Sequence, residues 1–254
     1  MKNKTLGIVA FLGITGLCIG LSGCGKNVDT VAESTVPIEI GEHVMYGSYQ
    51  GEPVEWRVLD KKDGEILLLS EYGLDAQPFD TSGKSRVDWK DSTIRKWLND
   101  DFYNSAFSEK EKENIVESKS EGFEEYNTSM NLTGGGKPYA YLEREIEDKV
   151  FLLSNTELCA YFSEDPYPGC YSDPYAHKEL LCYPTAYAKQ QLETRYQTET
   201  CGWWLCNHVY EDDSVELVSA YGQGSGTSRE NIKANTKSIA VRPAMWVTWQ
   251  SDME

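Results

Sequence analysis

Five cysteines in the second half of the chain are its side chains with the clearest capacity for chemistry. They are Cys159, Cys170, Cys182, Cys201 and Cys206. Thiols form disulfides, bind soft metal ions or act as nucleophiles. An odd number leaves at least one thiol without an intramolecular disulfide partner. We expect Cys170 and Cys182 to form a disulfide, because they would close a loop of modest length in an oxidising compartment.

A zinc site is a second possible use of these cysteines. Cys201, Cys206 and His208 would be ligands, with Cys182 or His177 as the fourth, since thiolate and imidazole both suit zinc. The close pairs typical of zinc ligands are missing, so no cofactor is predicted. A disulfide between Cys201 and Cys206 would need a bent strand, because five extended residues span roughly 17 Å. The Cα atoms of a disulfide lie only about 5.5 Å apart.

Aromatic residues near these cysteines are candidate ligand contacts. Residues 163–183 are rich in Asp, Pro and Tyr and are expected to form a loop that ends at Tyr183. Tyrosines on loops offer a large rigid face and one polar tip, which suits binding surfaces. The alternative is that they pack back on the domain. The predicted contact residues are Trp203, Trp204, Tyr167, Tyr171 and Tyr175.

One helix within residues 87–107 is expected to organise the domain that positions these residues. Ile94, Leu98, Phe102 and Ala106, with Trp97, keep the spacing that places side chains on one helix face. Ser92 or Asp91 can cap the first turn. Capping boxes are expected at 108–111 and 154–157, and a short helix at 185–193. Strands are predicted at 43–49, 54–60, 65–70, 150–153, 203–205, 215–221 and 239–249.

The first 37 residues are expected to direct export and then to tether the domain. Lys2 and Lys4 precede an apolar run at 6–21, and Leu-Ser-Gly-Cys at 21–24 resembles the lipobox of bacterial lipoproteins. This resemblance implies that residues 1–23 are a cleaved signal peptide and that Cys24 carries the lipid. Residues 24–37 are the lipidated cysteine and a flexible tether, and 38–254 form a single domain. The predicted location is extracytoplasmic, with the lipid as the only membrane contact.

Composition narrows the choice of partners. The chain of 254 residues has a net charge of −17, which disfavours nucleic acid and anionic lipid headgroups. No Ser-His-Asp motif, P-loop or dinucleotide glycine fingerprint occurs. The sequence therefore favours a protein that is not an enzyme.

Five sequence blocks resemble a large family of secreted and lipid-anchored bacterial proteins that is described as a domain of unknown function. The resemblance covers about residues 40–248. The blocks are Val-Glu-Trp-Arg-Val-Leu at 54–59, Ser-Thr-Ile-Arg-Lys-Trp-Leu-Asn at 92–99, Val-Phe-Leu-Leu-Ser at 150–154, Trp-Trp-Leu at 203–205 and Val-Arg-Pro-Ala at 241–244. Arg57, Arg95 and Arg242 lie in these blocks, and we expect them to brace strand ends and loops. A ligand-binding role for Arg242 is the alternative.

The family is similar in layout to the C-type-lectin-like fold of formylglycine-generating enzymes. This likeness implies an α+β domain with a curled antiparallel sheet, a few short helices and long loops. The family usually has Arg-Ser after Trp-Trp-Leu, where this chain has Cys206 and Asn207, so any interaction of that arginine is lost. The predicted function is non-enzymatic binding of a glycan or a surface protein. The alternative is a metal- or thiol-dependent enzyme that uses Cys206, although Glu211 stands where those enzymes have their second thiol.

Overall fold

The fold is described by a computed structural model that covers 38–84, 87–119, 146–162, 178–193, 198–208, 215–223 and 233–249. All of these residues belong to one compact unit that begins at Val36. Within these ranges, no helix is both long enough and apolar enough to span a membrane. Several predicted features lie outside the described residues. They are the signal peptide, Cys24, the tether, Tyr167, Tyr171, Tyr175, Cys170 and His177.

A curled five-stranded antiparallel sheet forms the larger layer, as the predicted α+β class requires. Its order is β1-β2-β3-β7-β4, and each neighbouring pair is antiparallel. The strands are β1 (His43–Tyr49), β2 (Glu52–Lys62), β3 (Glu65–Ser70), β4 (Ile115–Val116) and β7 (Ala244–Thr248). Segment 150–153 was predicted as a strand, but there Phe151 makes only an isolated bridge to Ala244. Strand β4 was not predicted, because two residues are too short for a visible pattern.

Strand β3 is central because its apolar residues are continuous. Ile66, Leu67, Leu68 and Leu69 are all buried, so both faces of the strand are covered, as expected for an unbroken apolar run. The preceding turn places Asp63 at φ 52° and Gly64 at φ 84°. Two successive residues with positive φ give the tight hairpin that matches strand twist. This turn fixes the register of β2 against β3.

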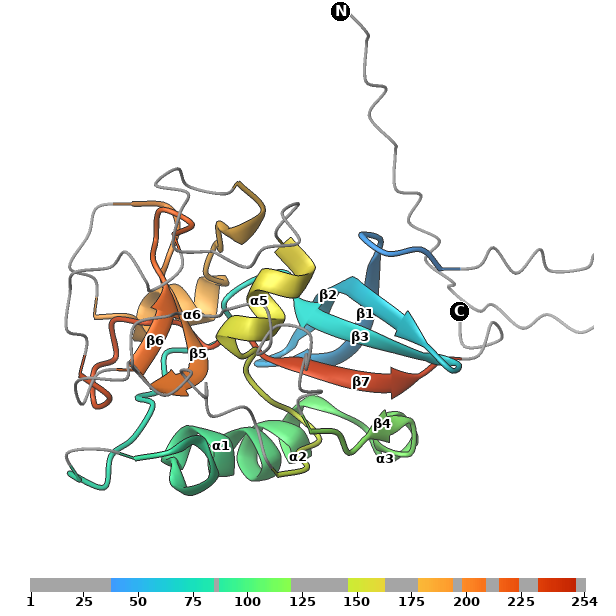
Figure 1. Ribbon diagram of the computed structural model, residues 1–254, viewed down its shortest axis with the longest axis horizontal. Coiled ribbons are helices and arrows are strands. Elements are labelled where there is room, and N and C mark those ends of the chain that lie inside the picture. Colours follow the sequence, from blue (N-terminus) through green and yellow to red (C-terminus); the bar gives the residue numbers. More distant parts are fainter. Residues whose placement is uncertain are drawn as a thin grey trace, which may run out of the picture. The chain divides into compact units, whose positions relative to one another are not determined.

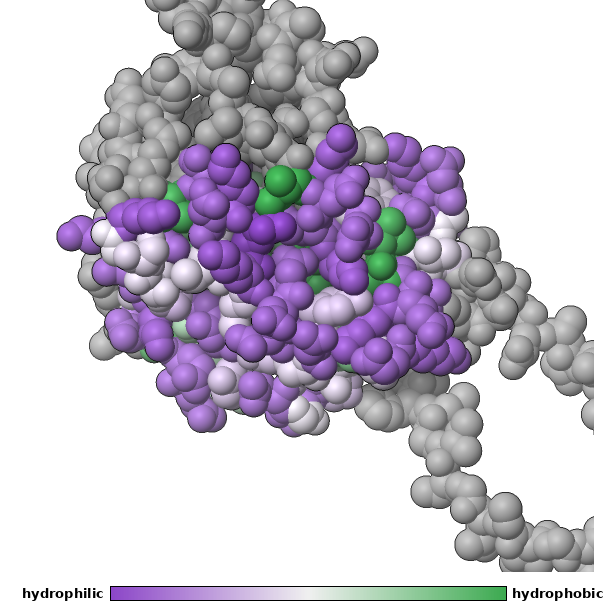
Figure 2. Space-filling model, turned by 90° about the horizontal axis from the view of Figure 1, so that it is seen from below, coloured by the Kyte–Doolittle hydropathy of each residue, from purple (hydrophilic) through white to green (hydrophobic). Residues whose placement is uncertain are grey.

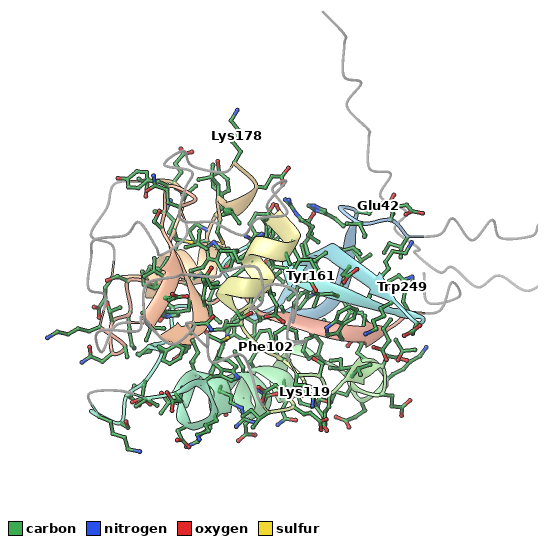
Figure 3. The ribbon with its side chains drawn as sticks, in the orientation of Figure 1. Glu42, Phe102, Lys119, Tyr161, Lys178 and Trp249 are labelled. Atoms are coloured by element: carbon green, nitrogen blue, oxygen red, sulfur yellow. The ribbon has the colours of Figure 1, made fainter. Side chains whose placement is uncertain are left out.

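The predicted organising helix lies against the sheet (Figure 1). It comprises the 3-10 helix η1 (Trp89–Asp91), α1 (Thr93–Trp97), a π-helical turn η2 (Leu98–Phe102) and α2 (Tyr103–Ala106). The Ser92 hydroxyl caps α1 by accepting from Arg95 N at 3.3 Å. Buried apolar residues recur every four positions from Ile94 to Ala106. In an α-helix each four-residue step drifts by about 40°, and the wider π turn corrects the drift. Phe102 therefore stays on the buried side (Figure 3).

Both predicted capping boxes are present. Ser108 and Glu111 bond reciprocally at the start of α3 (Glu109–Lys112). At the start of α5 (Asn155–Phe162), Ser154 N–H donates to Glu157 Oε2 at 2.7 Å and Glu157 N–H donates to Ser154 Oγ at 3.1 Å. The remaining described helices are η3 (Lys178–Leu180) and α6 (Ala186–Gln191).

A second, two-stranded sheet contains the tryptophan block. It pairs β5 (Trp203–His208) with β6 (Val215–Val218). In Figure 1 the orange β5–β6 pair lies at the opposite end of the domain from the β2–β3 turn. The parallel bridge between Trp203 and Ala240 connects this sheet to the chain that leads into β7. Both sheets therefore share one core.

The face of the domain that carries α1, α2 and α3 is mostly hydrophilic (Figure 2). Only small hydrophobic spots are visible among its described residues. The described residues of this face therefore show no large apolar patch that could serve as a docking surface.

Candidate functional site

Trp203 and Trp204 were predicted to contact a ligand, but both side chains are fully buried. Trp203 Nε1–H donates to Leu180 O at 3.1 Å, and Trp204 Nε1–H donates to Gln77 O at 3.0 Å. The two indoles lie on opposite faces of β5, and protein covers each face. They stabilise the core and present no surface on which a ligand could stack.

Two of the three exposed tyrosines in the described part of the chain lie where the end of β3 meets the segment before α6. Tyr72 is 38% exposed and Tyr183 is 47% exposed. Gly73 N–H donates to Tyr183 O at 3.0 Å, and Gly73 pairs in parallel with Pro184. This pairing places the backbones of Tyr72 and Tyr183 at neighbouring positions although 111 residues separate them in the sequence. We call these two residues the tyrosine pair.

Two carboxylates lie near one member of the pair, Tyr72. Glu55 and Glu71 both act on the Tyr72 phenol: burial raises its pKa, and the two negative charges raise it further. Tyr72 therefore remains a protonated donor at neutral pH. Glu55 also accepts from His43 Nδ1 at 2.7 Å. The surface thus combines phenol donors, carboxylate acceptors and an imidazole.

Glu71 is fixed by arginines. Arg57 donates to both of its oxygens, from Nε at 2.9 Å and from Nη2 at 2.8 Å. Arg242 Nη2 lies 3.8 Å from Glu71 Oε2. Bidentate contact orients the carboxylate and lowers its freedom. The predicted bracing roles of Arg57 and Arg242 are confirmed in this respect.

Arg242 is the most deeply buried charge among the described residues. Its side chain has no exposed surface, its Nε–H donates to Ser70 O at 2.8 Å, and its Cζ lies 5.0 Å from the Trp203 ring centroid. Its Nη1 and Nη2 atoms have no hydrogen-bond partner. Burial lowers its pKa, and nearby negative groups oppose this effect. A buried guanidinium with two unpaired nitrogens is costly unless an anion lies close.

Two of the predicted thiols lie next to this arginine. Cys182 and Cys201 are partners in an antiparallel bridge, and both are buried. Cys206 is also buried, with Sγ 3.8 Å from Asn207 Oδ1. Over the described segments, no group of three or more His, Cys, Asp or Glu side chains could hold a metal ion. The side chain of His208 lies outside the described part of the chain, so the predicted zinc ligand set stays a prediction.

Comparison with models of known protein families shows which family the chain belongs to. The model described as Domain of unknown function (DUF6273) matches residues 63–249. The chain belongs to the DUF6273 family. The predicted membership in an uncharacterised family is thereby confirmed. The match begins at the β2–β3 turn, so the predicted block at 54–59 lies before it. No curated protein and no solved structure shows a significant match.

The DUF6273 match contains both members of the tyrosine pair, together with Glu71 and Arg242. Tyr183 was predicted only as the end of the tyrosine-rich loop, and Tyr72 was not predicted as a site residue. A signal for Tyr72 was present, because a tyrosine two residues after a fully apolar strand leaves the core at the strand end. Its proximity to Tyr183 had no sequence signal.

Proposed function

We propose that this chain is an extracytoplasmic lipoprotein whose C-type-lectin-like domain binds a glycan without enzymatic action. The observation that carries this proposal is the exposed tyrosine pair with Glu55 and Glu71 near Tyr72. The proposed location and anchor come from the export signal at 1–24, and the proposed lectin likeness comes from the sequence blocks.

Aromatic faces and fixed carboxylates are complementary to the two kinds of surface that a sugar presents. The C–H face of a pyranose ring is apolar and stacks on a phenol ring, whose hydroxyl remains available as a donor. Sugar hydroxyls donate to carboxylates through charge-assisted hydrogen bonds. Glu71 is already oriented by Arg57, so little freedom is lost when a hydroxyl binds to it.

Charge narrows the class of glycan. The chain has a net charge of −17, and Glu55 and Glu71 lie at the surface in question. An acidic polysaccharide would be repelled. We therefore propose a neutral or amino-bearing glycan as the ligand.

Alanine substitution of the tyrosine pair tests this proposal. Tyr72→Ala and Tyr183→Ala are each expected to weaken binding to neutral oligosaccharides about tenfold, because an aromatic stacking contact contributes about 1–1.5 kcal/mol. Titration calorimetry on oligosaccharides selected from a glycan array measures the change. Tyr221→Ala is the matched control, since Tyr221 is 54% exposed and lies in the turn after β6.

Two results would count against a glycan ligand. One is equal affinity for the wild type, both pair variants and the Tyr221 control. The other is binding to isolated envelopes that protease treatment of the envelopes abolishes, because it would indicate a surface protein as the partner.

Acylation of Cys24 is tested separately. In cells fed a radiolabelled fatty acid, the wild type is expected to carry label and to sediment with membranes. Cys24→Ala should lose the label and be released, because its tether would have no lipid. Cys206→Ala is the thiol control and should keep the label. An unlabelled wild type would remove the anchor from the proposal while leaving the glycan test unaffected.

No specific observation favours the metal- or thiol-dependent alternative. Cys206 is buried on β5, where a substrate would not reach its sulfur.

A further inference from the structure

Cys182 and Cys201 face each other across two neighbouring chain segments. They pair as an antiparallel bridge, and Cys201 N–H donates to Cys182 O at 2.8 Å. Directly paired residues in such a bridge have Cα atoms about 5 Å apart. This separation lies within the range that a disulfide spans.

The two sulfur atoms also point to the same place. A Cβ atom built on Gly73 would lie 3.2 Å from Cys201 Sγ and 3.5 Å from Cys182 Sγ. Cys201 Sγ–H donates to Cys182 O at 3.5 Å, and Cys182 Sγ–H donates to Tyr183 O at 3.8 Å. The absence of a side chain at Gly73 therefore leaves a space that both sulfurs border.

Arg242 places a positive charge near both thiols. Its Nη1 and Nη2 atoms are buried without hydrogen-bond partners, and its charge acts on both cysteines. Burial opposes ionisation of Cys182, but the Cys201 hydrogen bond and the Arg242 charge outweigh burial, so the pKa of Cys182 lies below its ordinary value. The pKa of Cys201 is raised, because its thiol is hydrogen-bonded to Cys182 and is buried. The positive charge of Arg242 favours the thiolate form of either cysteine.

We propose that Cys182 and Cys201 form a disulfide in the folded domain. The oxidant is a disulfide. In cells it belongs to a protein of the cell envelope, and in vitro it is oxidised glutathione. During folding, before the pair is buried, the thiolate of one cysteine attacks one sulfur of the oxidant, forming a mixed disulfide and releasing the other sulfur as a thiolate. The second cysteine then loses its proton to solvent and displaces the oxidant from the first. Two electrons pass to the oxidant, which leaves as two thiols.

This pairing goes beyond the proposed binding function and differs from the predicted Cys170–Cys182 disulfide. It would close a loop of about 20 residues that includes α6. It would also fix Tyr183, the neighbour of Cys182, to the start of β5. Formation of the disulfide in cells depends on the proposed extracytoplasmic location. Oxidation of the purified protein by glutathione does not depend on that location.

Peptide mapping of the full-length protein tests the connectivity. The protein is isolated from cells without reductant, alkylated while denatured, and digested. Trypsin cleaves after Lys178, Lys189 and Arg195, so Cys182 and Cys201 fall in different peptides. Cleavage by chymotrypsin after Trp204 then separates Cys201 from Cys206. The expected product is one linked pair of peptides that contains Cys182 and Cys201.

The alternatives have distinct masses. A Cys182 peptide linked to the peptide of Cys170 or Cys206 would overturn the proposal. Full alkylation of both thiols, in cell-derived protein and also after equilibration with oxidised glutathione, would overturn it as well. If only the cell-derived protein is reduced, the pairing holds and export to an oxidising compartment fails.

Thermal stability gives an independent readout. Cys201→Ser should lower the melting temperature of oxidised protein by about 5–10 °C, through loss of a loop constraint, and Cys206→Ser is the matched control. Added reductant should lower the melting temperature of the wild type but not that of Cys201→Ser; no reductant effect on the wild type would contradict the disulfide.

Discussion

Replacing Asp148 with alanine is expected to lower the free energy of unfolding by about 3 kcal/mol. The Asp148 carboxylate is buried and accepts from Arg95 Nε at 2.6 Å and from Trp89 Nε1 at 2.7 Å. Its removal leaves the buried Trp89 indole N–H without an acceptor and Arg95 without its counter-ion. Because Arg95 is 25% exposed, water compensates part of its loss, so the effect lies near the lower end for a broken buried pair. Urea unfolding measures it.

The neighbouring ion pair provides the control. Lys149 Nζ lies 3.8 Å from Glu117 Oε1, and Glu117 is 59% exposed. Glu117→Ala should change stability by less than about 1 kcal/mol, as is usual for surface pairs. In the Asp148→Ala background, Arg95→Ala should cost much less than in the wild type, since the pair is already broken. Additive effects would show that Asp148 does not act through Arg95.

Local chemistry explains why several elements could be predicted from the sequence. The capping boxes at Ser108 and Ser154 depend on residues three positions apart, so the pattern contains the whole interaction. The apolar run in β3 likewise predicted a strand that is covered on both faces. The π turn in the organising helix had a weaker signal, the strict four-residue spacing from Ile94 to Ala106.

Tertiary packing explains the errors at the candidate site. Trp203 and Trp204 were predicted to be exposed, yet each face of β5 is covered by a segment distant in sequence, Leu180 on one side and Gln77 on the other. The run from Trp203 to Cys206 is as continuous as that in β3, and the same reasoning would have predicted its burial. The proximity of Tyr72 to Tyr183, and of Cys182 to Cys201, depends on how loops cross and has no local pattern.

A second large effect concerns Glu216 on β6 and is expected to depend on pH. Glu216 is buried, and Asn155 Nδ2 donates to its Oε2 at 2.8 Å. Burial raises the pKa of this carboxyl to about 7, and the Asn155 hydrogen bond only partly opposes the rise. The folded protein therefore binds this proton more tightly than the unfolded chain. The contribution of Glu216 to stability is complete below about pH 4.5, falls as pH rises to about 7, and stays low above it.

Glu216→Gln should remove this loss, because glutamine keeps an oxygen acceptor for Asn155 and carries no charge. At pH 8 the variant is expected to be more stable than the wild type by about 3 kcal/mol, the equivalent of the shifted pKa, and the two should converge near pH 4. Chemical unfolding at several pH values between 4 and 8 measures the difference. Glu52→Gln, at an exposed position on β2, is the matched control and should track the wild type throughout. A Glu216→Gln variant that tracks it too would show that the carboxylate is solvated when ionised, and that β6 opens to water at neutral pH.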